Sequence, residues 1–198
     1  MRFKPGHKAE SRLRMLDAAA KHVRQHGPEA VAIAEVMAEA GMTVGAFYKH
    51  FESREAIVRD AIDHMYTTSP AHLLLPEAAP TPEAVLRGFL DYYLSAEHRD
   101  TRTGGCPMPF LMADAIRLPP DARARLSNAV NATIDLVRGH IEALDRPPTA
   151  LPPYELAESL VAEVIGTLIL ARAEIDPARA DRRLSDGKRA VLARLGLL

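Results

Sequence analysis

The stretch that decides the fold is residues 31–51, VAIAEVMAEAGMTVGAFYKHF. Its first half places four apolar residues on one face of a helix with about 3.6 residues per turn, namely Ile33, Val36, Met37 and Ala40. Gly41 follows where a helix commonly ends in a left-handed residue, and Thr43 offers a hydroxyl cap for a second helix. The sequence therefore predicts two helices that meet at a tight corner, as in a helix-turn-helix.

The second helix divides into anchoring and accessible positions. Phe47 and Phe51 stand four residues apart and can fix the helix to its domain. The remaining side chains are small or carry hydrogen-bond donors, which suits a helix that enters the major groove of DNA. We expect a groove face of Val44, Gly45, Ala46 and Lys49, with Thr43 at its start, and phosphate contacts from Tyr48, His50 and Arg54. A helix corner with a purely structural role is the alternative, since such corners are common in helical proteins.

Further elements follow in order between Leu13 and Ile57: Ala19-Ala20, His26-Gly27, Ile33, Glu35-Val36, Ala40-Gly41-Met42-Thr43, Gly45, Phe47-Tyr48-Lys49-His50-Phe51 and Ser53-Arg54-Glu55. Together they resemble the DNA-binding domain of the TetR family of transcriptional repressors (TetR/AcrR-like). The family usually has Thr or Ser where this chain has Val31 and Ala32, so we expect a missing hydroxyl cap and a weaker phosphate contact there. The resemblance implies a C-terminal pocket for a small-molecule inducer, whose binding moves the fourth helix and separates the two recognition helices.

Composition and charge agree with this reading. The chain has 198 residues, 47% of them hydrophobic, which is enough for one or two small domains with cores. Its net charge is −1, but residues 1–24 carry +5, from Arg2, Lys4, Lys8, Arg12, Arg14, Lys21 and Arg24 against Glu10 and Asp17. This basic segment can lie along DNA phosphates, and a solvated terminus is the alternative. No apolar run reaches the roughly 18 residues of a membrane span, and a signal peptide is missing, so we expect a cytoplasmic protein.

Prolines and glycines mark the ends of further helices. The periodicity predicts a first helix that ends at Gly27-Pro28, a fourth capped by Ser53, and a later helix from Pro82 with a break after Arg99. Further helices are predicted over about 107–116, 121–143, 154–173 and 177–195. The proline-rich segment 68–82 reads as a linker. No strand pattern is present, so the sequence predicts an all-α fold of about nine helices, with a helix-turn-helix domain over residues 1–52 and a ligand-binding and dimerisation domain over residues 53–198.

The last two helices are the predicted interface of a homodimer. One apolar stripe contains Leu156, Leu160, Val164 and Leu168, with Val161, Ile165 and Ile169 beside it. This surface is wider than a single helix needs for its own domain, and Gly166 permits close helix approach. A dimer would present two recognition helices to half-sites one DNA turn apart, so the operator is expected to be roughly palindromic. The stripe reads equally well as the core of the regulatory domain.

Two features are candidates for the response to an inducer. Bulky, adaptable side chains that can line an apolar pocket occur at Met65, Tyr66, Phe89, Tyr92, Tyr93, Met108, Phe110 and Met112, although each is also an ordinary core residue. Cys106 is the single cysteine, and it precedes a predicted helix whose dipole would favour the thiolate. Its Gly-Cys context resembles a branch of the family in which such a cysteine sometimes answers electrophiles or oxidants. A buried small hydrophobic residue is the alternative for Cys106.

Motifs of catalysis are missing from the sequence. There is no glycine-rich phosphate loop after a strand, no serine elbow and no histidine pair four residues apart around an acid. We therefore expect no enzyme activity, no cofactor and no metal. The predicted function is a ligand- or electrophile-released repressor that binds double-stranded operator DNA as a homodimer. The alternative is a helical small-molecule-binding or adaptor protein without specific DNA binding.

Overall fold

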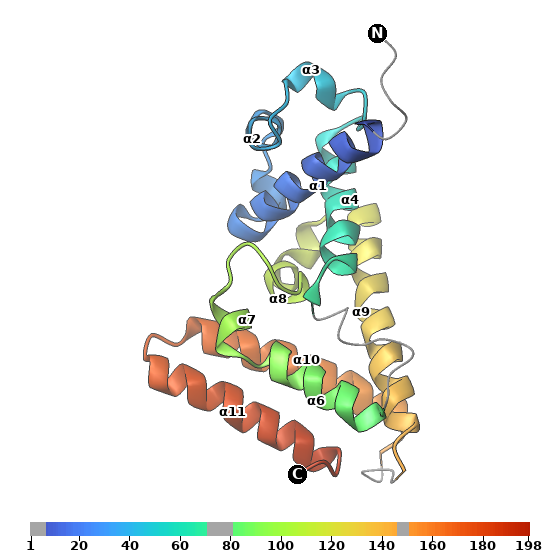
Figure 1. Ribbon diagram of the computed structural model, residues 1–198, viewed down its shortest axis with the longest axis vertical. Helices are drawn as coiled ribbons and strands as arrows, with labels where there is room; N and C mark the ends of the chain where they lie inside the picture. Colours follow the sequence, from blue (N-terminus) through green and yellow to red (C-terminus); the bar gives the residue numbers. More distant parts are fainter. Residues whose placement is uncertain (1–6, 71–80, 146–150) are drawn as a thin grey trace. The chain divides into compact units, whose positions relative to one another are not determined.

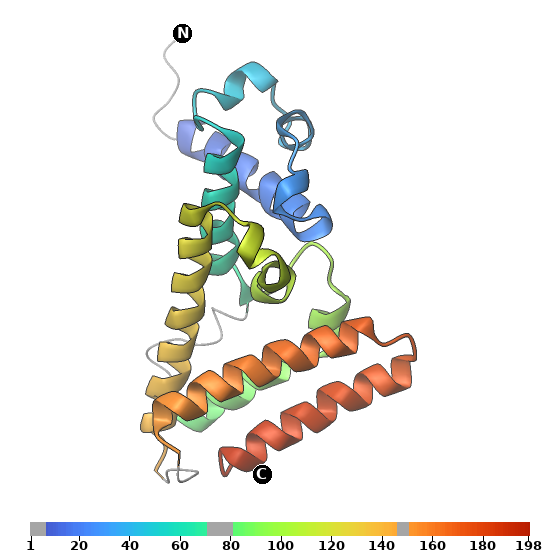
Figure 2. The same cartoon turned by 180° about the vertical axis from the view of Figure 1, so that it is seen from behind.

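The computed structural model describes residues 7–70, 81–145 and 151–198. Within these ranges the chain forms ten α-helices, two 3-10 helices and no strand, which confirms the predicted all-α class (Figures 1 and 2). None of the helices in these ranges is long and apolar enough to cross a bilayer. The chain divides into two compact units. Unit 1 is the described chain up to Thr68 together with Arg102–Ser127, and unit 2 is Ser69–Thr101 together with Asn128–Leu198.

Unit 1 begins with four helices whose ends follow the sequence signals. These are α1 (His7–His26), α2 (Ile33–Glu39), α3 (Val44–Phe47) and α4 (Arg54–Thr67), with a 3-10 turn, η1 (Pro28–Ala30), after α1. Gly27 and Gly41 have φ of 85° and 69°, so each breaks the chain in a conformation that favours glycine. The Ser53 hydroxyl accepts a hydrogen bond from the Ala56 N–H at 3.1 Å and caps α4 as predicted.

The core of unit 1 joins these helices to a later segment of the chain. Met15, Ala19 and Val23 of α1 pack with Val36 and Met37 of α2 and with Ile57, Ala61 and Met65 of α4. Leu111, Leu118 and Leu126 complete the same cluster from α8 (Met108–Leu111), the loop before α9 and the first turns of α9 (Pro120–Glu142). Removing one such side chain to Ala typically costs about 2–5 kcal/mol. The helix-turn-helix therefore rests on a shared core and not on its own residues alone.

Two predicted helices are divided in the structure. The helix expected from Pro107 to about Ile116 is α8 followed by a 3-10 helix, η2 (Met112–Arg117). Leu118 precedes a proline, which disfavours helical backbone, so the short segment tightens and ends there. The break expected after Arg99 comes earlier, because the Ser95 hydroxyl accepts the His98 N–H at 3.0 Å and starts a new helix, α7 (Ala96–Asp100).

Unit 2 contains α6 (Pro82–Tyr93), α7, the second part of α9, α10 (Pro153–Ala173) and α11 (Pro177–Arg194). The last two helices lie side by side, joined by a short turn in which the Asp176 carboxylate caps α11 at the N–H groups of Ala178 and Arg179. They approach each other closely at Gly187, where an added Cβ would stand 2.7 Å from Thr167 Cγ2. The close approach expected at Gly166 is therefore not made within this protomer.

Several predicted features lie outside the described residues. They are most of the linker 68–82, the basic residues Arg2 and Lys4, and the prolines at positions 147 and 148. The predicted boundary between the DNA-binding and regulatory domains, at residues 52 and 53, stays a prediction. The two compact units of the structure meet at other positions of the chain.

Candidate nucleic-acid interface

The corner between α2 and α3 has the geometry expected of a helix-turn-helix. Val36, Met37 and Ala40 are buried and Ile33 packs against them, so the predicted apolar face of α2 is confirmed. The Met42 N–H donates to Met37 O at 2.8 Å and closes the turn after Gly41. Thr43 is the N-cap of α3, but its hydroxyl makes no capping hydrogen bond, so only the position and not the predicted bond is found. Ala32 caps α2 without a side-chain bond, as its residue type predicts.

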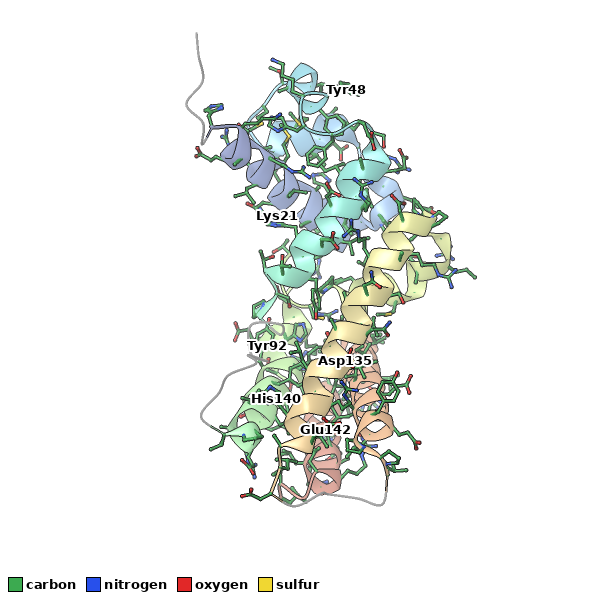
Figure 3. The ribbon with its side chains drawn as sticks, turned by 90° about the vertical axis from the view of Figure 1, so that its right-hand side faces the viewer. Lys21, Tyr48, Tyr92, Asp135, His140 and Glu142 are labelled. Atoms are coloured by element: carbon green, nitrogen blue, oxygen red, sulfur yellow. The ribbon has the colours of Figure 1, made fainter. Side chains whose placement is uncertain are left out.

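α3 has a buried face and an accessible face. Phe47 and Phe51 are buried with ring centroids 5.6 Å apart, which confirms them as anchors. The spiral continues beyond α3, since the His50 and Phe51 N–H groups both donate to Phe47 O at 2.9 and 3.0 Å. Val44 is 46% exposed and Tyr48 is 65% exposed, and Figure 3 shows Tyr48 beside α3, well away from Lys21 on α1. Of the other predicted contacts, Thr43, Gly45 and Lys49 are exposed, and Ala46 and His50 are half-buried.

Arg54 is less available than the sequence suggested. Its guanidinium donates to Glu29 O at 2.7 Å and to the Glu55 carboxylate at 3.1 Å. These bonds join the start of α4 to η1. Any phosphate contact by Arg54 must share or replace them, so its predicted role stays a prediction.

Basic residues of α1 fall into two groups. Lys21 pairs with Glu39 at 2.9 Å, Arg24 donates to Gly105 O at 3.1 Å, and Arg12 bonds Asp60 while its guanidinium carbon lies 4.3 Å from the centre of the Phe51 ring. These three residues join elements of unit 1. Lys8 and Arg14 form no ion pair within the described residues, and they face a different surface.

That surface is a cavity of about 580 Å³ between the first turns of α1 and the α2–α3 corner, here named the α1–α3 cavity. Lys8 and Arg14 line it from α1, and Thr43, Ala46, Lys49 and His50 line it from α3 and the residues next to it. None of the described residues that line it is acidic. Positive charge therefore gathers directly beside the accessible face of α3, which suits a polyanion.

A second cavity of about 390 Å³ is shared by Tyr48, Lys49, His50 and the start of α4. The carboxylate of Asp60, which lines this cavity, is paired with Arg12 and Arg59. Burial opposes ionisation of Asp60, but hydrogen bonds from Arg59 and Arg12 outweigh burial and hold the pKa of the carboxyl below its usual value. Arg59 also bonds Asp121 at 3.3 Å and so links α4 to α9 within unit 1.

The candidate inducer contacts fall into the two units. Met65, Met108, Cys106, Phe110 and Met112 belong to unit 1, where Met65 and Met108 are fully buried and Met112 packs against the core. Phe89, Tyr92 and Tyr93 belong to unit 2, and the Phe89 and Tyr93 rings lie 5.2 Å apart. The structure places Cys106 in the interior, 4% exposed. Their roles in ligand binding stay predictions.

The sequence reasoning missed His98, which the structure places at the centre of the aromatic group of unit 2. Tyr92 stacks on its ring at 5.0 Å, Tyr93 meets it edge-on at 4.8 Å, and its Nδ1 lies 2.9 Å from Tyr93 O. Burial lowers the pKa of His98 to about 4, against the Tyr93 hydrogen bond that raises it, and the nearby Arg172 lowers it further. Ser95 lies three positions before His98 and is a residue type that caps helices, so it is the sequence signal that could have predicted a helix at His98.

The fold and site together define a helix-turn-helix protein with a second helical unit. The family model for bacterial regulatory proteins of the tetR family matches residues 15–61, and the model for the tetracyclin repressor-like C-terminal domain matches residues 82–185. The chain belongs to the TetR family of transcriptional regulators. Among curated proteins, no sequence matches this chain.

Solved structures share this fold at low sequence identity. E. coli NemR, in a form described as reduced, has a TM-score of 0.77 at 19% identity and covers 91% of this chain and 94% of its own. A TetR-family regulator from Agrobacterium tumefaciens gives 0.78 at 18% identity, with coverage of 95% and 98%. The regulatory protein TetR from Rhodobacter sphaeroides gives 0.73 at 21% identity, with coverage of 89% and 96%. At these identities the likeness concerns the fold.

Proposed function

We propose that this regulator is a repressor that binds an operator in double-stranded DNA through α3. The observation that carries the proposal is the arrangement at α3, where two buried phenylalanines hold a short spiral with a small-residue, exposed opposite face. Small side chains allow close approach to base edges in the major groove. Lys8, Arg14 and Lys49 line the adjoining α1–α3 cavity and supply the attraction to phosphates.

The test is a fluorescence anisotropy titration with duplexes from the DNA that flanks the gene of this chain, against a scrambled duplex of equal length and composition. The wild-type protein is expected to prefer one flanking duplex by about 10³-fold or more. Lys49→Ala should weaken that complex by about tenfold or more, since a base or phosphate contact is lost.

Lys21→Ala is the matched control, because the Lys21 ammonium is already paired with Glu39 at 2.9 Å. It should bind as the wild-type protein does. Equal binding of flanking and scrambled duplexes in low salt would reject the repressor and favour the alternative of a helical binding or adaptor protein.

We also propose that the repressor acts as a homodimer through α10 and α11. The stripe of Leu156, Leu160, Val164 and Leu168 is buried within the protomer, so it forms part of the core. A different face of α10 remains accessible, with apolar residues spaced by four, three and four positions at Ala162, Gly166, Ile169 and Ala173. A Cβ added at Gly166 meets no atom within 4 Å, so the backbone there is open to a second copy.

Release by a small molecule is the third part of the proposal. A ligand releases DNA only if it binds the DNA-incompetent arrangement better, typically by about 1–3 kcal/mol. Phe89 and Tyr93 of unit 2, and Met65 and Met112 of unit 1, supply adaptable apolar contacts for such a ligand. A thermal-shift screen of the whole chain tests this part, since a ligand of the native state raises the melting temperature with its concentration.

Release by an electrophile is a second route, motivated by Cys106. Because the residue is 4% exposed, attack on its sulfur requires local opening first. If this route operates, an electrophile that dissociates the wild-type protein from DNA leaves Cys106→Ser bound. An equal response of both proteins would reject it.

A further inference from the structure

The α1–α3 cavity has the chemistry of a site for one phosphate and its sugar. Lys8, Arg14 and Lys49 supply three cations around it, and no described lining residue is acidic. Met42 and Ala46 add apolar surface to the same cavity. A volume of about 580 Å³ exceeds that of a phosphate alone, and the apolar surface suits the adjoining deoxyribose.

Two imidazoles, those of His7 and His50, line this cavity among the described residues, and His50 lies close to several fixed cations. Burial lowers its pKa from 6.5, and Lys8, Arg12, His7 and Lys49 lower it further by charge repulsion. Its Nδ1 is covered by protein atoms and has no hydrogen-bond partner among the described residues, so Nε2 is the nitrogen left for a ligand. A pKa below 6.5 favours the neutral imidazole of His50 at pH 7 in the free protein.

Among the described residues that line the two cavities at His50, the charged side chains are cationic except Glu52 and Asp60. Arg14 joins the cations in the α1–α3 cavity, while Glu52, Arg59 and Asp60 line the second cavity that His50 also borders. Asp60 accepts hydrogen bonds from both Arg12 and Arg59, so these two cations offset most of its negative charge. Glu52 alone does not offset the cations.

We propose that the α1–α3 cavity binds one phosphate of the operator backbone and that His50 holds this phosphate in its protonated form, so that operator binding takes up a proton. This inference rests on the proposed function. As the phosphate enters, its negative charge offsets Lys8, Arg14 and Lys49, a proton from solvent adds to the imidazole, and the imidazolium N–H donates to a phosphate oxygen.

The sign of the pH dependence follows from this cycle. The proton is held more tightly in the complex than in the free protein, so operator affinity rises as pH falls through the higher pKa of the complex. It levels off below the lower pKa of the free protein. Each unit between the two values gives about tenfold in affinity per His50.

The experiment measures operator affinity of the whole chain from pH 8 to pH 5.5 at fixed salt, for the wild-type protein, His50→Gln and His26→Gln, since the exposed His26 at the end of α1 does not line the cavity. The wild-type protein and His26→Gln should bind about tenfold or more tightly at the low end, and His50→Gln should show a flat profile. Lys8→Ala and Arg14→Ala should each weaken binding and reduce the salt dependence by about one phosphate contact, while Lys21→Ala should do neither.

A second measurement does not depend on DNA. The His50 imidazole is followed by NMR, with its signal assigned by its loss in His50→Gln, in sodium sulfate and in sodium chloride of equal ionic strength. Sulfate, a phosphate analogue whose charge is constant over this range, should raise the pKa of His50. An equal pKa in both salts, or an unchanged pH profile in His50→Gln, would overturn the inference. If the wild-type protein itself shows no specific DNA binding at any pH, the proposed function is rejected instead.

Discussion

At α3, neighbouring side chains have opposite environments within a single turn. Phe47 is fully buried, whereas Tyr48 is 65% exposed, although their rings meet edge-on with centroids 5.2 Å apart. This contact restrains the Tyr48 ring and leaves most of the residue exposed. The phenol can therefore donate to a phosphate at a small cost in side-chain entropy.

At the residue scale, the first prediction concerns Tyr48 and Phe47. Tyr48→Ala should leave the melting temperature within about 2 °C and weaken operator binding by about tenfold, because it removes an exposed donor. Phe47→Ala should lower stability by roughly 3–5 kcal/mol, because it removes a buried ring. Thermal unfolding and anisotropy titrations separate the two effects. A Tyr48→Ala protein that unfolds like Phe47→Ala would contradict the assignment of Tyr48 to the accessible face.

His98 gives a prediction for stability against pH. Its pKa is about 4 in the folded chain and near 6.5 when unfolded, so the unfolded state binds one more proton between those values. Stability is then unaffected above pH 6.5 and falls as pH falls toward 4, by on the order of 3 kcal/mol at most. Urea unfolding at several pH values should show this slope, reduced in His98→Gln. Identical slopes in both proteins would contradict the buried, neutral state of His98.

At the element scale, the packing of α10 on α11 depends on one glycine. Gly187 faces Thr167 so closely that an added Cβ would lie 2.7 Å from its Cγ2 and 3.3 Å from its Cβ. Rotation of Thr167 can bring its hydroxyl or its hydrogen to the place of the methyl, but Thr167 Cβ stays 3.3 Å from the added Cβ, so the helix packing must adjust. Gly166 on α10 has open space in the protomer and offers a matched comparison.

We predict that Gly187→Ala destabilises the chain by roughly 1–3 kcal/mol through overpacking, partly offset by better helix propensity. Adding Thr167→Ala should restore most of the loss. Gly166→Ala should leave the stability of the protomer unchanged or raised by about 1 kcal/mol, yet weaken the proposed dimer. Chemical unfolding and sedimentation velocity check both parts. A stable Gly187→Ala protein with normal helix content would contradict the close approach.

Element boundaries also show what the sequence could predict. Gly27, Gly41, Ser53 and Pro82 placed four boundaries correctly, because each acts through local backbone geometry or a local cap. Ser95 and the division of α8 from η2 were missed, since proline and polar residues at such positions allow more than one local arrangement. Periodicity over long helices was reliable, as α9, α10 and α11 match their predicted ranges within one or two residues.

At the scale of the whole molecule, the partners of individual side chains could not be predicted from the sequence. Arg54 reads as a phosphate ligand but bonds Glu29 O, 25 residues away, and Lys8 and Arg14 proved to share a cavity with His50. The apolar stripe of α10 was predicted to serve an interface, the core or both, and its residues Leu156, Leu160, Val164 and Leu168 lie in the core. Periodicity identifies an apolar face but not what covers it, because core and interface demand the same residue types.

The proposed dimer gives the prediction at this scale. Ile169→Glu places a charge on the accessible face of α10, where Ile169 is 39% exposed, and should convert the dimer to a monomer in sedimentation velocity. Ile116→Glu is the control, because Ile116 is 79% exposed on η2 in unit 1. A dimer that survives Ile169→Glu and dissociates with Ile116→Glu would move the interface elsewhere.

The most direct measurement of the central claim is hydroxyl-radical footprinting of the wild-type protein on the DNA that flanks its own gene. The protein should protect two patches about one helical turn apart, related by a dyad in the sequence. Tyr48→Ala and Lys49→Ala should remove both patches at concentrations that give full protection by the wild-type protein. Protection that is uniform along the duplex, or that survives both substitutions, would contradict operator binding through α3.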